Sequence, residues 1–158
     1  MIPQIRTVHP DEFDVFMRFM ERAYGQSRDF FRRFYAHIYR PTPEACANNY
    51  VIAEKGQIIS HVGLFPIHVA SAGVRLTMGG IGGVATRRDA RGRGHMTRLM
   101  RHAIDEMRAR GYPASWLGGD RQRYNTFGWE MGAPVCRRNF SRRSLDWYDV
   151  EPVTVKEV

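Results

Sequence analysis

Apolar and polar positions at the start of the chain repeat with the period of an amphipathic helix. A short strand at residues 5–8 is followed by apolar side chains every three or four positions over residues 13–24, and Gly25 ends this helix. Ser27 is placed to cap a second helix over residues 27–38, which a proline-containing segment then ends. Four aromatic side chains of this second helix are predicted to lie in the core, with the wall of the acceptor site as the alternative: Phe30, Phe31, Phe34 and Tyr35.

The pattern changes to that of strands after Asn49. Runs rich in β-branched and aromatic residues at 50–54, 58–69 and 74–86 are separated by short glycine turns, which predicts three consecutive antiparallel strands. The elements expected after them are an amphipathic helix from near Gly92 to Gly111, a strand at 114–117, a short helix or turn at 120–127 and a strand at 135–141. The order β-α-α-β-β-β-α-β-α-β predicts an α/β fold.

The length and the charge of the chain narrow the class of protein. With 158 residues, 43% of them hydrophobic, one domain over residues 1–145 is expected. Residues 146–158 alternate like the start of another strand, which leaves open whether the chain is a fragment of a longer protein. The net charge is +8, and only Lys55 and Lys156 of the 24 basic residues are lysine. Guanidinium groups suit phosphates and carboxylates, although the codon bias of an arginine-rich genome explains the same excess.

Cysteine usage and the N-terminus indicate a cellular compartment. Cys46 and Cys136 are far apart, with no CxxC pair and no His/Cys cluster, so neither a disulfide framework nor a metal site is expected. The first residues lack a signal-peptide pattern, and no apolar run is long enough to cross a bilayer. We therefore expect a cytoplasmic location and no membrane partner.

The strongest chemical signal is a basic glycine turn between a strand and a helix. The strand ends near Thr86 and the next helix begins near Gly92, so several unpaired backbone N–H groups meet at a ready anion site. Gly92 and Gly94 present no side chain that would keep a phosphate away, and arginines surround the turn. A Walker loop needs a Lys-Ser/Thr pair and a dinucleotide loop needs GxGxxG, and this turn has neither.

Two motifs resemble those of the GNAT superfamily of acyl-CoA N-acyltransferases. The segment Arg-Gly-Arg-Gly-His-Met at 91–96 looks like its Q/R-x-x-G-x-G/A pyrophosphate loop, and 124–129 is similar to its Y-x-x-x-G-F/W turn. The resemblance covers residues 5–141 and is specific over 80–130. It implies the GNAT fold, with a central mixed, mostly antiparallel sheet and helices on both faces. Met96 stands where the family usually has Gly or Ala. A bulky residue at this position resembles the acetyltransferase subgroup named for enhanced intracellular survival, which accepts one there.

The resemblance also implies a ligand and roles for residues. Acetyl-CoA would be the co-substrate, with no metal, and a small-molecule or protein amine would be the acceptor. Tyr124 matches the general acid that protonates the departing thiolate, because a tyrosine hydroxyl keeps its proton at neutral pH. Gly119 and Asp120 would lie beside the cofactor. The remaining cofactor-binding positions are Val84, Ala85 and Thr86 for pantetheine, and Arg91, Gly92, Arg93, Gly94, His95, Met96 and Thr97 for pyrophosphate.

Several alternatives stay open at this point. The general base is unassigned, and in the subgroup it is thought to be a carboxylate of a later domain. An acyl-CoA-binding module without catalysis is the second reading. A nucleic-acid-binding domain is the third, motivated by the charge and the arginine pairs 87–88, 137–138 and 142–143, but few aromatics accompany them and no nucleic-acid partner is expected. The acceptor and a homo-oligomer are also left open. The candidate bases are His61, His68, Asp120 and Glu130.

Overall fold

A computed structural model of the chain describes residues 3–71 and 73–132 and contains one five-stranded sheet. Its strand order follows the chain, and all neighbours are antiparallel except the parallel pair β4 and β5. The predicted mixed, mostly antiparallel sheet is therefore confirmed. The strands are β1 (Ile5–Thr7), β2 (Asn49–Glu54), β3 (Gln57–Ser71), β4 (Val74–Thr86) and β5 (Ser115–Leu117).

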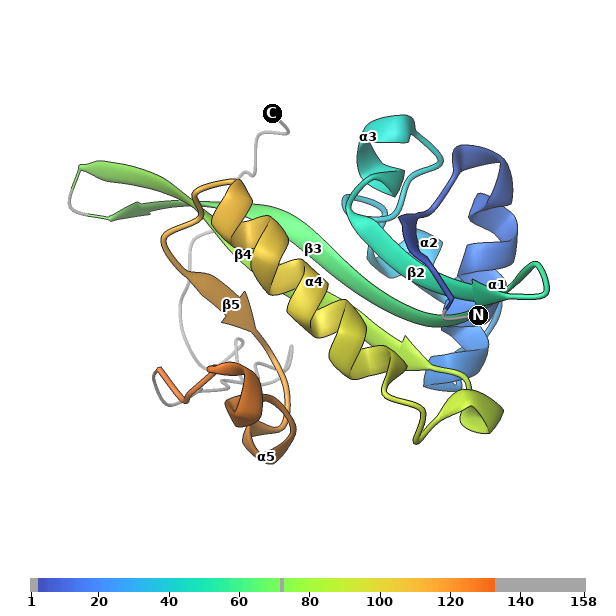
Figure 1. The fold of residues 1–158 in the computed structure, drawn as a ribbon. Helices are drawn as coiled ribbons and strands as arrows, with labels where there is room; N and C mark the ends of the chain where they lie inside the picture. The colour runs from blue at the N-terminus through green and yellow to red at the C-terminus, as the bar shows by residue number, and fades with distance from the viewer. Residues whose placement is uncertain (1–2, 72, 133–158) are drawn as a thin grey trace, which may run out of the picture.

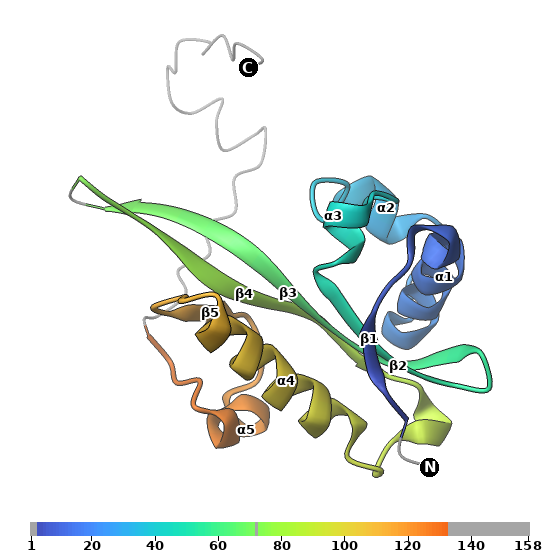
Figure 2. The same ribbon diagram turned by 45° about the horizontal axis from the view of Figure 1, so that its top comes forward.

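One face of the sheet is covered by the three N-terminal helices, as Figure 2 shows. They are α1 (Phe13–Tyr24), α2 (Phe30–Phe34) and α3 (Pro43–Cys46). The apolar stripe of α1 is buried against side chains of β2 and β3, and Gly25 ends the helix in the left-handed conformation, as its position predicts. Among the buried residues of this layer are Phe16, Met17, Met20, Val51 and Ile58.

The opposite face is covered by α4 (His95–Ala109), which runs along β3 and β4 (Figure 1). Its apolar side chains at helical spacing form a second core with β2, β3 and β4. The predicted covering of both faces by helices is therefore confirmed. The remaining elements are the short helix α5 (Arg121–Tyr124) and the 3₁₀ turns η1 (Pro10–Glu12), η2 (Arg88–Ala90) and η3 (Asn125–Phe127).

The second helix is shorter than its periodicity predicts. It spans only Phe30–Phe34 and starts after Asp29, whose φ of 63° is left-handed, and α3 is an additional short helix. The chain turns after α2 because Phe31 and Tyr39 both enter the α1 core, where their ring centroids lie 5.6 Å apart. The predicted burial is right for Phe31 but wrong for Phe34 and Tyr35, which are 62% and 41% exposed.

Two predictions fall outside the described residues: the strand at 135–141 and the additional segment at 146–158. The arginine pairs 137–138 and 142–143 lie there too. Among the helices of the described part, none is long and apolar enough to cross a bilayer.

Candidate active site

The two parallel strands separate where the predicted site begins. β5 pairs with β4 only over residues 79–81, whereas β4 continues to Thr86. No other strand of the described chain pairs with residues 82–86 on this side. On the β3 side the register shifts, because His61 pairs with Ala85 but Gly63 pairs with Gly82. The extra β4 residue makes a bulge, so this stretch presents main-chain groups that β5 does not use.

A buried polar cluster fixes the bulge. Gly83 has a φ of 63°, and His61 Nδ1 lies 2.7 Å from its carbonyl oxygen. His61 Nε2 lies 3.0 Å from Asn49 Oδ1, and the Ser60 hydroxyl donates to the Ala85 carbonyl at 3.1 Å. Burial lowers the pKa of His61 to about 4, and this outweighs the bond to the Gly83 carbonyl, which acts in the opposite direction. The bulge is held by a neutral imidazole at pH 7.

The glycine turn leads into a helix without a capping side chain. Gly92 and Gly94 have φ values of 75° and 73°, a conformation that favours glycine, and a Cβ at either position would meet open space. Gly94 is the N-cap of α4, and the first helical bond runs from Arg98 N to its carbonyl. Within the described chain, no group accepts a hydrogen bond from the N–H groups of residues 92–97. Unpaired N–H groups therefore lie at the positive end of the dipole of a 15-residue helix, an arrangement that suits an anion.

The unpaired β4 stretch and this helix terminus line one hollow of about 530 Å³. Tyr24 from α1 and Arg123 from α5 complete its wall. The structure therefore brings together most of the residues that the resemblance assigns to the cofactor. The predicted residues that line the hollow are Val84, Ala85, Thr86, Arg91, Gly92, Gly94, His95, Met96 and Thr97.

Three side chains of the loop are turned to neighbours within the protein. The Arg93 guanidinium donates to Glu54 at 3.2 Å and to the Asp89 carbonyl at 3.1 Å. The His95 ring is buried, with Nε2 3.8 Å from Glu54 Oε1, and Met96 packs against the α4 core. For these residues the backbone amide, and not the side chain, is the group available to an anion.

Tyr124, Gly119 and Asp120 stand outside the lining of this hollow. Tyr124 ends α5, and its ring is buried in the α4 core. A Cβ at Gly119 would lie 2.7 Å from Tyr124 Cε2, so the glycine leaves room for that ring. Asp120 caps α5 by accepting from Gln122 N at 3.0 Å. Gly119 and Asp120 therefore help to position Tyr124.

Tyr24 and Arg123 are the site residues that sequence reasoning missed. The Tyr24 hydroxyl donates to the Val84 carbonyl at 3.0 Å, across 60 positions of the chain. Burial, and then the neighbouring Tyr124, raise the pKa of Tyr24 to about 12. Tyr24 as a whole is 44% exposed. No local motif marks either residue.

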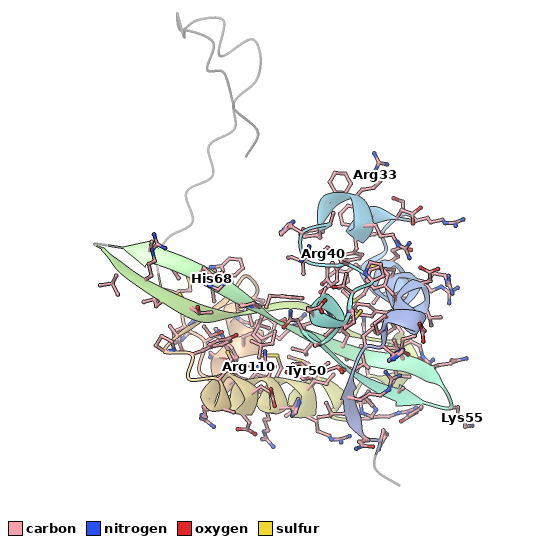
Figure 3. All side chains as sticks on the ribbon, turned by 90° about the horizontal axis from the view of Figure 1, so that it is seen from above. Arg33, Arg40, Tyr50, Lys55, His68 and Arg110 are labelled. Carbon is pink, nitrogen blue, oxygen red and sulfur yellow. The ribbon has the colours of Figure 1, made fainter. Side chains whose placement is uncertain are left out.

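The four candidate bases all have other contacts or lie elsewhere. His61 is buried under the bulge, and Asp120 caps α5. Glu130 accepts from the Arg121 guanidinium at 2.6 Å and 3.0 Å. His68 lies on the outer part of the β3–β4 hairpin, away from the α1–α3 layer (Figure 3), with Nδ1 3.1 Å from Thr77 Oγ1. No cluster of three or more potential metal ligands occurs in the part that the structure describes.

Two further hollows adjoin the first. A hollow of about 670 Å³ shares Tyr24, Thr86 and Arg91 with it and also contains Arg18, Arg22, Arg87 and Arg88, so its walls are strongly basic. On the α1–α2 side, a hollow of about 560 Å³ shares only Tyr24 with it and is lined mainly by aromatic and aliphatic side chains. Tyr24 therefore stands where three hollows of different chemistry meet.

Comparison with known families gives a match over most of the chain. The family model described as "Acetyltransferase (GNAT) domain" matches residues 4–132. No curated protein matches the sequence significantly.

Solved structures of GNAT-type proteins have the same fold. A "predicted acetyltransferase" of Clostridium acetobutylicum, solved with acetyl-CoA, has a TM-score of 0.71 at 15% identity, over 94% of this chain and 99% of that one. The glucosamine-6-phosphate N-acetyltransferase of Arabidopsis thaliana has a TM-score of 0.65 at 15% identity, over 89% and 100%. A "probable N-acyltransferase" of Enterococcus faecalis has a TM-score of 0.68 at 20% identity, over 81% of this chain but 32% of its own. At these identities the likeness shows the fold.

Proposed function

The chain belongs to the GNAT acetyltransferase family, whose domain model spans residues 4–132, and from this premise we propose that it transfers the acetyl group of acetyl-CoA to a primary amine by direct attack. The observation that carries the proposal is a single hollow formed by the unpaired stretch of β4 and the uncapped N-terminus of α4. A linear thioester with a pyrophosphate at one end needs both features. The acceptor is a small-molecule or protein amine.

The pyrophosphate would be bound by main-chain N–H groups. Those of residues 92–97 are free of acceptors in the described chain and converge at the positive end of the α4 dipole. Arg91 and Arg123 line the same hollow and add charge-assisted bonds. The neighbouring basic hollow supports the approach of a polyanion. The pantetheine amides would then pair with Val84, Ala85 and Thr86, as a strand would.

Transfer itself requires one proton to reach the leaving sulfur. The amine nitrogen attacks the thioester carbon, the carbon–sulfur bond breaks, and the sulfur takes a proton. Tyr124 is proposed as its donor, because it matches the family's Y-x-x-x-G-F/W turn and directly follows Arg123, which lines the hollow. Tyr24 approaches from the α1 face and Tyr124 from the α4 face. The thioester would lie between them, near Val84.

The base that takes the proton of the amine is proposed to lie outside the described residues. Each candidate within them has another role or place: His61 is buried, Asp120 caps a helix, Glu130 pairs with an arginine and His68 is distant. The proton of the amine would then pass to bulk water or to a later segment of the chain. Membership of the enhanced intracellular survival subgroup fits this, because some of its members are thought to use a carboxylate of a later domain. Met96, a bulky residue where the family usually has Gly or Ala, supports that assignment.

A cytoplasmic location is part of the same proposal. The buried Cys46 is a free thiol, and burial raises its pKa, which keeps it in the unreactive protonated form. Free thiols of this kind are typical of proteins from reducing compartments. Recovery of the tagged protein from a secreted fraction with its thiols oxidised would contradict the assignment.

A binding module without catalysis is the second candidate, favoured by the engagement of all four candidate bases in other contacts. Calorimetric titration with CoA and a release assay for free CoA separate the two. Binding together with amine-dependent CoA release supports the enzyme, whereas binding without release over a broad amine panel supports the module. Absence of CoA binding would contradict both.

A further inference from the structure

The hollow of about 560 Å³ on the α1–α2 side, here called the aromatic hollow, lies over a part of the sheet where glycines leave the backbone bare. Gly63, Gly80 and Gly82 are neighbours on β3 and β4, since Gly63 pairs with Gly82 and Phe65 pairs with Gly80. A Cβ at Gly63 would lie 2.4 Å from the Phe65 ring, and one at Gly80 would lie 2.5 Å from Ile67 Cδ1. Phe65 and Ile67 therefore lie down over bare backbone. The result is a flat apolar floor.

The walls of the hollow are aromatic as well. Phe30 and Phe31 contact each other at 5.4 Å between centroids, and Phe31 contacts Tyr35 at 5.9 Å. Trp116, which pairs with Gly80 from β5, lines the hollow from the other side. Trp116 is 60% exposed, so a large apolar surface faces solvent inside this hollow of about 560 Å³. Such surface in a concave site favours a ligand with an apolar body.

The charges of the lining argue against a polycationic ligand. None of the described residues that line this hollow is Asp or Glu, and His37 is its one basic side chain in that part of the chain. A second ammonium group would be desolvated here without a partner, which is costly. The net charge of +8 adds long-range repulsion. A ligand with one amine and an otherwise uncharged body fits this lining.

The hollow reaches the place of the proposed reaction. Its floor includes Gly82 and Gly83 of the β4 bulge. The next residue, Val84, lines the hollow of about 530 Å³ proposed to bind acetyl-CoA, hereafter the cofactor hollow. Tyr24 lines both, with its hydroxyl on the Val84 carbonyl. An amine at the bulge would have its nitrogen beside the thioester and its body over Phe65 and Trp116.

We propose that this hollow is the acceptor site and that it selects primary amines with one apolar, preferably aromatic, body and no second charge, such as arylalkylamines. The inference rests on the proposed acetyl transfer and adds the substrate class to it. The same apolar surface would suit a long acyl chain on CoA, and the experiment separates these two sources of the apolar group.

The test measures free CoA released by the full chain with three acceptors: 2-phenylethylamine, ethylamine and spermidine. With acetyl-CoA, kcat/KM for 2-phenylethylamine is expected to exceed that for ethylamine by about 10-fold or more, as burial of a phenyl ring implies. Spermidine is expected to be the poorest of the three. A second arm holds the amine constant and compares acetyl-CoA with hexanoyl-CoA, where acetyl-CoA is expected to be the better donor.

The variant Trp116→Ala checks the location. It is expected to reduce the ratio of phenylethylamine to ethylamine kcat/KM several-fold, mainly through KM. Phe34→Ala is the matched control, because Phe34 is an equally exposed aromatic residue outside the lining, and the ratio is expected to stay at the wild-type value. Calorimetric titration with CoA checks that both variants are folded, because a folded variant is expected to keep the wild-type Kd of CoA.

The outcomes distinguish the inference from its premise. CoA binding and turnover with spermidine preferred over 2-phenylethylamine, or with no effect of Trp116→Ala on the ratio, would overturn the substrate class and leave acetyl transfer standing. Preference for hexanoyl-CoA without a preference for the aryl amine would assign the hollow to the acyl chain and overturn the acceptor site. Absence of CoA binding would remove the premise itself.

Discussion

The cofactor hollow and the aromatic hollow both contain residues of β4 and share Tyr24, but different chemical groups form their walls. The first is made mainly of main-chain groups, with Gly92 and Gly94 in left-handed conformations. The second is made of side chains that lie over glycines and keep polar groups away. One is suited to a charged group of fixed shape and the other to a variable apolar body.

The part of the proposed site that binds CoA and the part that binds the acceptor therefore depend on different stretches of the sequence. A pyrophosphate is the same in every CoA thioester, and the site proposed for it draws mainly on one contiguous segment, residues 91–97, together with Arg123. The acceptor differs from enzyme to enzyme, and the hollow proposed for it draws on α1, α2, β3, β4 and β5. The bulge at Gly83 lies between them, so changes there act on both.

The largest expected effect concerns Tyr124, the proposed proton donor. Tyr124→Phe removes the proposed proton donor and keeps the buried ring, so kcat is expected to fall by about 10²–10⁴-fold while the Kd of CoA changes little. Steady-state kinetics of CoA release and calorimetry measure the two quantities. Tyr112→Phe is the control, because that tyrosine packs at the other end of α4, and its kcat is expected to match the wild type. An unchanged kcat in Tyr124→Phe would exclude it as the acid.

The support beneath the bulge is expected to make the fold sensitive to acid. The pKa of His61 is about 4 in the fold against 6.5 for an ordinary histidine, so between these values the unfolded chain binds more protons. The stabilisation is complete above pH 6.5 and is lost as the pH falls toward 4. Urea denaturation at pH 7.5 and pH 4.5 is expected to show a loss of roughly 3 kcal/mol from this residue.

The comparison of two histidine variants isolates that contribution. His61→Gln is expected to be less stable at pH 7.5 and to lose less stability on acidification than the wild type. His68→Gln alters an exposed histidine of the hairpin and is expected to keep the wild-type pH dependence. Equal pH dependence in the wild type and His61→Gln would contradict the neutral, buried imidazole.

The cofactor hollow alone is tested by a glycine pair at the two ends of α4. Gly94→Ala places a side chain in a left-handed position that costs about 1–2 kcal/mol, and relief of the strain turns the amides away from the anion. The Kd of CoA is expected to rise about 10-fold. Gly111→Ala has the same kind of strain at φ 66° beyond the other end of the helix, so it is expected to lower stability without changing the Kd. Equal CoA affinities would break the account of the loop.

The smallest expected effect concerns the residue that both hollows share. Tyr24→Phe deletes the hydrogen bond to the Val84 carbonyl, worth about 1 kcal/mol. The KM values for acetyl-CoA and for the amine are both expected to rise a few-fold, because Tyr24 lines both hollows. Kinetics with each substrate varied in turn measure them. A change confined to one substrate would show that the two hollows are not coupled through Tyr24.

Sequence reasoning succeeded where the determinants are local. The strand–turn–helix around residues 86–97 follows from glycine punctuation and helical periodicity within one short segment. It failed for the second helix, because the turn that sends Phe31 and Tyr39 into the core depends on their contact with α1. The Tyr24 bond to Val84 joins positions 60 residues apart, and no propensity or motif predicts such a contact.

The CoA site is tested most directly by titrating ¹⁵N-labelled protein with CoA and following its amide resonances. The proposed CoA site predicts that the largest shifts occur at residues 84–86 and 92–97, while amides of the outer hairpin, such as Val69 and Leu76, stay in place. Shifts centred on the hairpin or on the aromatic hollow, with residues 92–97 unchanged, would contradict it.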